Sequence, residues 1–396
     1  MMQDKACDPR SSKSTMVPRR DWILLPIISL STILVIVVSA EALARRVFSA
    51  SATSLRSCLI ADATTGVRAI PNSVCWDKVP DGPLVEYKFD CNGFRTGKAC
   101  QPKSGEGFRI ALIGSSLAMG QNVPIQETLG ALLPEELSRH AGRQVDLYNF
   151  AMAFGFPRNT YLRFNDVLAT KPDLVLWVLT AVDVKLASFS YSEFAQDQAS
   201  SAPPGFLAKL KNTIRDKMRE LGVDPKSAGL TALRYFVQKH MSQSNYIQSY
   251  LNIPDGNEGD WDAGPGALRS ELTPQWEARL KNLEQYAADI ARMAKTAGVP
   301  LVIVMVPNRA QAAMISMGDW PRGIDPFRLD QELRAIAVRH GSTYIEILPD
   351  FRTTPRPERH YYPIDGHPDA GGHALIARFL AKELSAGAVP ALTATP

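Results

Sequence analysis

Two serines follow a short apolar run near the start of the chain's main body, and an Asp-x-His pair lies near its far end. The run RIALIG leads into Ser115 and Ser116, while YYPIDGHPDAGG contains Asp365 and His367. A serine becomes a nucleophile when a histidine accepts its proton and a carboxylate orients that histidine. In a loop, the Asp-x-His spacing lets the carboxylate accept one imidazole N–H while the other ring nitrogen faces the serine. These residue types indicate nucleophilic catalysis and leave open which serine would act.

The elements that must position these residues alternate along the chain. Strands are expected at 109–113, 145–150, 174–179, 301–306 and 343–347, and helices at 126–139, 159–169, 275–297, 328–339 and 371–384. Such alternation is typical of a parallel sheet covered by helices on both faces. Ligands bind at the carboxyl ends of parallel strands, and both serines directly follow the first strand of this core. We therefore expect an α/β domain with the serines at its ligand-binding edge.

Residues 190–270 interrupt this alternation. YSEFAQDQASSAPPG is typical of a loop, LAKLKNTIRDKMREL of a basic amphipathic helix, and a second helical stretch is expected at about 231–251 before the Gly/Asp-rich GNEGDWDAGPG. We interpret the segment as an insertion on the α/β core. A cap over the substrate and a helical buttress against the sheet fit it equally well.

The N-terminal region contains an apolar stretch, residues 22–40, without a charged side chain. Its nineteen residues would span nearly the ~30 Å hydrocarbon core as a helix. Five basic and three acidic residues precede it, so the positive-inside rule predicts a single-pass protein of the inner membrane with its N-terminus in the cytoplasm and its main domain in the periplasm. Arg45 and Arg46 weaken this prediction without reversing it. A cleavable signal peptide is the alternative, since residues 42–44 resemble an A-x-A cleavage site, but the apolar stretch exceeds the usual h-region.

Four of the five cysteines follow this stretch closely, at Cys58, Cys75, Cys91 and Cys100, and the last 296 residues contain none. This pattern fits two disulfides that staple a lead-in segment without a core of its own, in an oxidising compartment. Three pairings are possible, and Cys58–Cys75 with Cys91–Cys100 closes the shortest loops. We expect no metal site, because no Cys-x-x-Cys pair occurs and the nearest histidine is His140.

Composition excludes other classes of function. The formal net charge is only +4 over 396 residues, and no basic block with interleaved aromatic residues occurs, so we expect no nucleic-acid partner. GSSLAMG lacks the lysine of a P-loop and the spacing of G-x-G-x-x-G, so we expect no nucleotide and no other cofactor.

Four blocks in order resemble the SGNH (GDSL-like) hydrolases. IGSSLAMGQNV is similar to the first block, usually G-D-S-x-x-x-G, and NFAMAFGFPRNTY to the second. KPDLVLWVLTAVDV resembles the third, usually G-x-N-D after a strand, and DGHPDAGGHALIA the last; with EYKFDCNGFR, the order holds from about residue 85 to 386. The resemblance implies a three-layer α/β/α, flavodoxin-like sandwich. It also implies ester hydrolysis or, in membrane-anchored envelope branches, acyl transfer on polysaccharides.

The resemblance also assigns roles to individual residues. Ser116 matches the nucleophile, His367 the general base and Asp365 its orienting partner. The backbone N–H groups of Ser116 and Gly155 match two donors of the oxyanion hole. Val182 stands where the family has the asparagine that supplies the third donor, from its side chain.

The sequence departs from the family pattern in three places. Ser115 replaces an aspartate that organises the nucleophile loop, Val182 replaces the asparagine, and the spacing of the acid and base is D-x-H where D-x-x-H is commoner. Loss of one oxyanion donor costs roughly 10²–10³ in turnover, or about 3–4 kcal/mol. Asn149 or Asn159 could supply a substitute amide.

These features predict a periplasm-facing serine esterase or O-acyltransferase. Its expected substrates are small esters or acylated, especially acetylated, carbohydrate of envelope or exported polysaccharide, and polysaccharide-assembly proteins are possible partners. The alternative, motivated by Ser115 and Val182, is a catalytically degenerate SGNH-like protein that binds a glycan or a partner in a polysaccharide-assembly system. The expected layout is a cytoplasmic tail at 1–21, a transmembrane helix at 22–40, the lead-in at 41–104, the hydrolase-like domain at 105–386 and a tail at 387–396.

Overall fold

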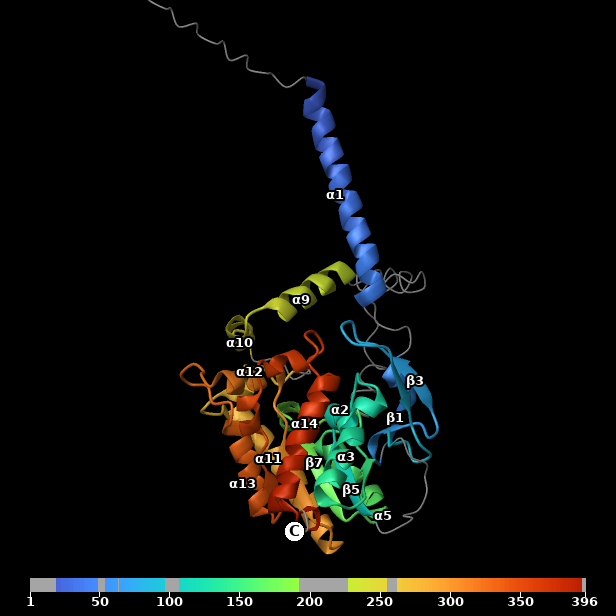
Figure 1. The fold of residues 1–396 in the computed structure, drawn as a ribbon, viewed down its shortest axis with the longest axis vertical. Helices are drawn as coiled ribbons and strands as arrows, with labels where there is room; N and C mark the ends of the chain where they lie inside the picture. Colours follow the sequence, from blue (N-terminus) through green and yellow to red (C-terminus); the bar gives the residue numbers. More distant parts are fainter. Residues whose placement is uncertain are drawn as a thin grey trace, which may run out of the picture.

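A computed structural model describes residues 19–48, 54–62, 64–96, 107–191, 227–254 and 262–393. A long N-terminal helix rises from an α/β body, with small β-hairpins at the edge of that body (Figure 1). The expected basic helix at 207–221, together with Cys7 and Cys100, lies outside the described residues.

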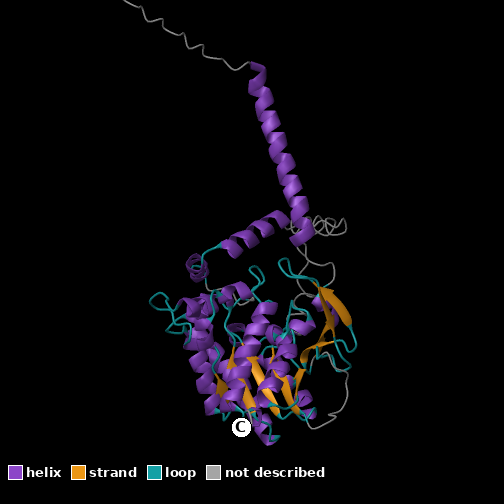
Figure 2. Cartoon of the chain, in the orientation of Figure 1, coloured by secondary structure: helices purple, strands orange, loops and turns teal. Residues whose placement is uncertain are grey.

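The central sheet has five parallel strands in the order β6-β5-β7-β8-β9 (Figure 2). Every residue of β5, β7 and β8 is buried, as central parallel strands covered on both faces require. In the register, Ile110 pairs with Leu147 on one side and with Leu174 on the other. All five expected strands are present, at β5 (Phe108–Gly114), β6 (Val145–Asn149), β7 (Leu174–Leu179), β8 (Leu301–Met305) and β9 (Thr343–Ile345).

Helices cover both faces of this sheet. The crossovers β5-α3-β6 and β7-α11-β8 move across the sheet in opposite directions, so right-handed connections place α3 and α11 on opposite faces. Helix α14 packs against α3, and α11 packs against α4, α6 and α13. The fold is therefore the expected three-layer α/β/α sandwich, with a flavodoxin-like strand order. The helices of the two layers are α3 (Leu129–Ala141), α14 (Ala370–Glu383), α4 (Pro157–Leu162), α5 (Phe164–Ala169), α6 (Ala181–Lys185), α11 (Pro274–Thr296) and α13 (Arg328–Arg339).

Two helical expectations need correction, and one helix was not expected. The helix expected at 159–169 is two helices, α4 and α5, which meet at Arg163. The stretch expected at 231–251 also divides, into α9 (Ala228–His240) and α10 (Gln243–Leu251), because the Ser242 side chain accepts a bond from the Asn245 N–H and starts a new helix. Helix α12 (Arg309–Met317) was not expected, and the Asn308 side chain caps it in the same way.

The lead-in segment is not coreless, contrary to expectation. It forms two antiparallel hairpins, and Val67, Val85 and Tyr87 join the main hydrophobic core. Apolar and polar residues alternate along these strands, so one side of each strand can be apolar and pack on the α/β body. The hairpin strands are β1 (Leu59–Asp62), β2 (Gly66–Ala69), β3 (Val74–Asp77) and β4 (Val85–Lys88).

The Cys58–Cys75 disulfide links residue 58, just before β1, to β3. This disulfide is one of the two in the pairing that closes the shortest loops, Cys58–Cys75 with Cys91–Cys100. Cys91 is disulfide-bonded as well.

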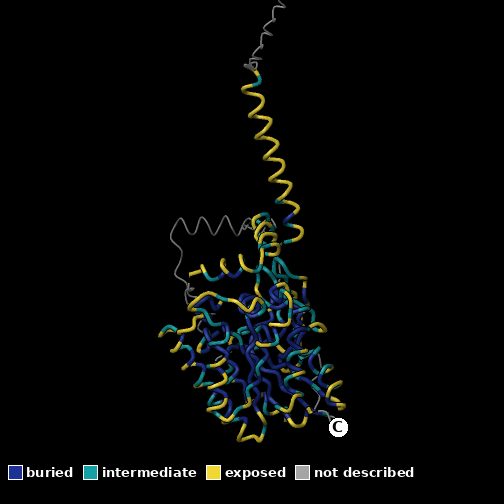
Figure 3. Tube along the Cα trace, turned by 60° about the vertical axis from the view of Figure 1, so that its left-hand side comes forward, coloured by how far each residue is buried: buried dark blue, intermediate teal, exposed yellow. Residues whose placement is uncertain are grey.

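Helix α1 (Arg19–Phe48) is long and apolar enough to cross a membrane. Its surface is exposed along almost its whole length (Figure 3). Among the described residues, only its last turns approach other elements, where they contact α9.

Candidate active site

Ser116 lies at the carboxyl edge of the sheet, at the start of the short helix α2 (Ser116–Met119). Two glycines shape this turn. A Cβ on Gly114 would lie 2.6 Å from the Val178 carbonyl oxygen, and Gly120 ends α2 in the left-handed conformation with φ +80°. The sequence G-S-S-L-A-M-G therefore forces a sharp strand-to-helix turn that carries both serines.

A continuous chain of hydrogen bonds joins Ser116 to the far end of the sequence. The Ser116 Oγ lies 2.8 Å from His367 Nε2, and His367 Nδ1 lies 2.6 Å from Asp365 Oδ1. The backbone N–H of His367 also donates to this Oδ1, at 3.2 Å. The structure thus brings together the three residues that the sequence predicts as nucleophile, base and orienting acid, and it selects Ser116 over Ser115 as the partner of the histidine.

Each member of the His367–Asp365 pair stabilises the charged form of the other. Burial alone would raise the pKa of Asp365, but the neighbouring imidazole and its hydrogen bonds hold it below its ordinary value. Burial likewise opposes protonation of His367, but the Asp365 carboxylate raises the pKa of the imidazole above its ordinary value. The arrangement suits a histidine that must accept a proton from a serine.

Asn122 belongs to this network, and the sequence did not single it out. Its side-chain Nδ2 donates to Asp365 Oδ1 at 2.8 Å. Its backbone N–H donates to the Tyr87 hydroxyl at 2.7 Å, and its carbonyl accepts from the Tyr362 hydroxyl at 2.9 Å. Asn122 has φ +67°, a conformation that asparagine tolerates better than most residues. An asparagine in this stretch therefore signals a turn, but nothing in the sequence signals its contact with Asp365.

The lead-in segment supports both loops of the site. The Arg95 guanidinium donates to the carbonyls of Gly120 (2.6 Å) and Val123 (2.9 Å), directly after α2. On the opposite loop, the Ile364 N–H donates to the Asp81 carboxylate at 2.6 Å. The segment before the α/β body is therefore part of the scaffold that positions Ser116 and His367.

Ser115 contacts an acid from the neighbouring turn. Asp183 is completely buried, and its Oδ2 accepts from the backbone N–H and the hydroxyl of Thr180, at 2.7 and 2.6 Å. Burial raises the pKa of Asp183 to about 6, against the opposing effects of the Thr180 and Ser115 hydroxyls. The Ser115 side chain does not cap α2, and its hydroxyl lies close enough to Asp183 to lower the pKa of that carboxyl.

The structure does not bring Gly155 to the Ser116 cavity. The Gly155 N–H donates to the Met152 carbonyl at 2.8 Å, and Gly155 lines a separate small cavity beside Asn159. Ala153 and Phe154 line the Ser116 cavity in its place, with Phe154 in the left-handed conformation at φ +62°. The left-handed turn at Phe154 thus places the glycine away from the position that the resemblance implied.

The side-chain donor is also missing on this side of Ser116. Val182 lines the cavity, as its place in the third block implied, and offers no N–H from its side chain. Neither proposed substitute faces the cavity with its amide. The Asn149 Nδ2 donates to the Ala118 carbonyl at 2.9 Å, and the Asn159 Nδ2 donates to the Phe154 carbonyl at 2.8 Å.

The cavity above Ser116 has a volume of about 1040 Å³. The candidate triad lies on its floor, and α9 forms part of its wall. Within the part of the chain that the structure describes, no group of three or more His, Cys, Asp or Glu side chains could hold a metal ion.

No protein-family model and no curated protein sequence matches the chain. Among solved structures, TesA is similar at 13% identity over 72% of this chain and 99% of its own, with a TM-score of 0.37. A lipase/acylhydrolase from Enterococcus faecalis is 12% identical over 70% of this chain and 95% of its own, with a TM-score of 0.37. An acetyl-xylooligosaccharide esterase from Geobacillus Stearmophilus is 13% identical over 71% of this chain and 95% of its own, with a TM-score of 0.36. The fold class rests on the strand order and crossovers of the chain itself.

Proposed function

We propose that the chain is a membrane-anchored serine esterase or O-acyltransferase of the SGNH type. The observation that carries this proposal is the unbroken hydrogen-bond chain from Ser116 through His367 to Asp365 on the floor of a cavity. A serine, a histidine and a carboxylate in this order are the parts that acyl transfer from an ester requires.

The reaction would proceed in two acyl-transfer steps. Ser116 Oγ attacks the ester carbonyl as its proton passes to His367 Nε2, and the Asp365 carboxylate stabilises the imidazolium. The tetrahedral intermediate then collapses, His367 donates the proton to the leaving alcohol, and an acyl-Ser116 ester remains. Water or a sugar hydroxyl, deprotonated by His367, next attacks this ester and restores the serine. The backbone N–H of Ser116 would bind the oxyanion in both steps.

The proposed location follows from α1 and the charges before it. Because basic residues predominate before the apolar stretch, we place the N-terminus in the cytoplasm and the α/β body in the periplasm. A periplasmic acyl-transfer enzyme would meet envelope and exported polysaccharides, so we propose acylated, especially acetylated, carbohydrate as substrate or product. Export would also allow the disulfides to form.

A fluorophosphonate probe tests the proposal directly. We expect the full-length protein in detergent to react with the probe and to hydrolyse p-nitrophenyl acetate. Ser116→Ala should lose both activities, while Ser115→Ala, the matched neighbour, should still react with the probe. A folded wild-type protein that neither reacts nor hydrolyses the ester would refute the proposal.

The second candidate is a degenerate SGNH-like binding protein. It is favoured by the oxyanion side, where the Val182 side chain carries no donor and the Gly155 N–H is bonded to the Met152 carbonyl. For this function we expect calorimetric binding of acetylated oligosaccharide that is equal for the wild type and Ser116→Ala, with no probe labelling of either. Labelling of the wild type at Ser116 would exclude it.

A further inference from the structure

Helix α9 is joined at its N-terminus to the helix that can cross the membrane. Glu41 of α1 accepts hydrogen bonds from the Ser227 hydroxyl (2.8 Å) and from the backbone N–H groups of Ala228 (3.0 Å) and Gly229 (2.8 Å). A helix N-terminus leaves such N–H groups without partners inside the helix. Glu41 is also the first charged residue after the apolar stretch 22–40. Helix α9 therefore begins where α1 leaves that stretch.

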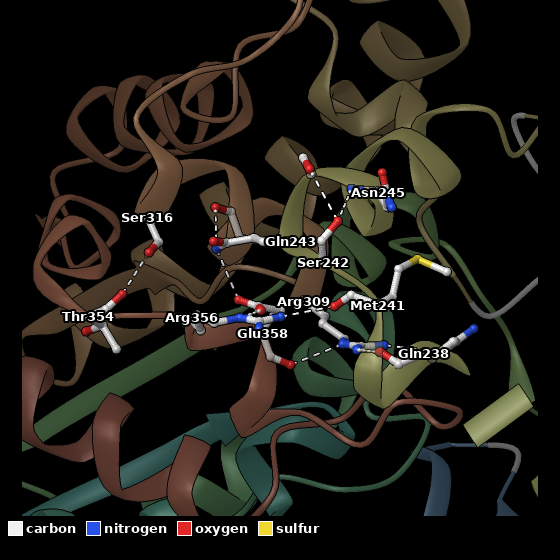
Figure 4. Close-up of polar contacts among 12 residues, drawn as sticks. Gln238, Met241, Ser242, Gln243, Asn245, Arg309, Ser316, Thr354, Arg356 and Glu358 are labelled. Atoms are coloured by element: carbon white, nitrogen blue, oxygen red, sulfur yellow. Dashed lines mark hydrogen bonds and ion pairs between the residues drawn. The ribbon is translucent and has the colours of Figure 1, made fainter. Parts of the chain in front are cut away.

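The C-terminal end of α9 is joined to the α/β body (Figure 4). Arg309 of α12 donates to the side chain and to the carbonyl of Gln238, each at 3.2 Å, and also to the Glu358 carbonyl at 3.1 Å. The Arg356 guanidinium donates to the Met241 carbonyl at 3.1 Å. Through these bonds, helix α9 bridges α1 and the α/β body, at the end of the body nearest α1 (Figure 1).

One side of helix α9 carries an apolar stripe that forms part of the cavity wall. Leu230, Leu233 and Val237 recur at steps of three and four, which places them on one side of the helix, and Met241 directly follows its last residue. All four line the same cavity as Ser116, together with Arg234 and Gln238 of α9. Leu230 is 69% exposed, Leu233 59% and Val237 45%. Apolar surface of this kind gains free energy when an apolar ligand covers it.

We propose that the cavity accepts a membrane-borne amphiphile, whose apolar chain lies along the α9 stripe while its ester group reaches Ser116. The inference rests on the proposed function and on α1 spanning the membrane. Because α9 is bonded to α1 directly after the apolar stretch, the stripe is continuous with the membrane surface. The cavity volume of about 1040 Å³ is at the upper end of the ~300–1,000 Å³ found for small-molecule sites. That is far more than an acetyl ester needs, so the substrate class is an ester whose acyl group is a lipid chain, which narrows the proposed function from acetyl to long-chain acyl groups.

Photo-crosslinking tests this occupant without requiring catalysis. Full-length Ser116→Ala is placed in phosphatidylcholine vesicles that contain phosphatidylcholine with a diazirine in one acyl chain, and adducts are mapped by peptide mass spectrometry. We expect adducts on α9 and on the cavity floor at Phe154 or Val182. The double variant Leu233→Asp/Val237→Asp should lose the floor adducts. Phe236→Asp is the matched control, because Phe236 is an equally exposed apolar residue of α9 outside the cavity lining, and it should keep them.

Ester selectivity supplies the second measurement. We expect wild-type protein in the same vesicles to hydrolyse p-nitrophenyl dodecanoate in preference to p-nitrophenyl acetate. The double variant should lower the ratio of the two rates by roughly tenfold, and Phe236→Asp should leave it unchanged. Absence of floor adducts, or an equal effect of both α9 variants, would overturn the inference. Floor adducts without turnover of either ester would support the membrane-borne occupant and overturn the proposed function.

Discussion

The two sides of Ser116 are built to different degrees. On the proton-transfer side, His367, Asp365 and Asn122 form a network in which each side chain has its partner at 2.6–2.8 Å. On the oxyanion side, the Val182 side chain has no polar group and the Gly155 N–H is bonded to the Met152 carbonyl. The comparison teaches that this site is organised to generate a nucleophile, and that the described residues on the oxyanion side offer few hydrogen-bond donors to the transition state.

The largest effect on kcat is expected from a substitution on the proton-transfer side. Asp365→Asn keeps the shape of the side chain but removes the charge that stabilises the imidazolium, and it favours the wrong imidazole tautomer. We expect kcat for p-nitrophenyl acetate to fall by roughly 10⁴. A loss of less than tenfold would show that the proton-transfer side is not what limits the reaction.

On the oxyanion side, a substitution is expected to increase kcat. Val182→Asn restores a side-chain amide at the cavity wall, and we expect kcat to rise by roughly 10²–10³. Val182→Leu is the matched control, since the leucine side chain resembles that of asparagine in shape and carries no hydrogen-bond donor. An unchanged rate in a folded Val182→Asn protein would mean that another donor already binds the oxyanion.

The pH dependence sharpens the description of His367. Only the neutral imidazole can accept the Ser116 proton, and the Asp365 carboxylate, acting against burial, raises the pKa of His367. The rate should therefore increase with pH, by roughly tenfold per unit on the acid side, around a midpoint above the ordinary value of about 6.5. In Asp365→Asn the residual activity should have a lower midpoint. A wild-type midpoint below the ordinary value would contradict the stabilised imidazolium.

A smaller effect is expected at Asn122. Asn122→Gly removes the amide that donates to Asp365 while tolerating the left-handed backbone at this position. Loss of this one bond to a charged group should lower kcat by about tenfold with little change in KM. An increased KM at constant kcat would assign Asn122 to substrate binding and remove it from the positioning of Asp365.

Much of the fold was readable from the sequence because it depends on local pattern. The continuous apolar runs of β5, β7 and β8 predict buried parallel strands, and the stripe of α11 after Pro274 predicts its helix. The lead-in was harder, since its apolar residues are few and pack on a body that begins beyond residue 107. Its contribution of Arg95 and Asp81 to the site follows from that packing and from no motif.

The site was predictable in its reactive groups and less so in its supports. Ser116, Asp365 and His367 occur in recognisable short patterns, but the contact between Asn122 and Asp365 joins residues 243 positions apart. Gly155 matches the glycine of the family block, but the path of the backbone turn at Phe154 places it outside the Ser116 cavity. Helix α9 lies largely within a stretch that the sequence predicts to be helical, whereas its bonds to Glu41 and Arg309 depend on the tertiary fold.

The most direct measurement is the site of the covalent adduct after reaction with a fluorophosphonate. The full-length wild-type protein is labelled, digested and analysed by peptide mass spectrometry, which distinguishes Ser115 from Ser116 in GSSLAMG. We predict a single adduct on Ser116 that is absent after denaturation before labelling. An adduct on Ser115, or none on a folded protein, would contradict the assignment of Ser116 as the nucleophile.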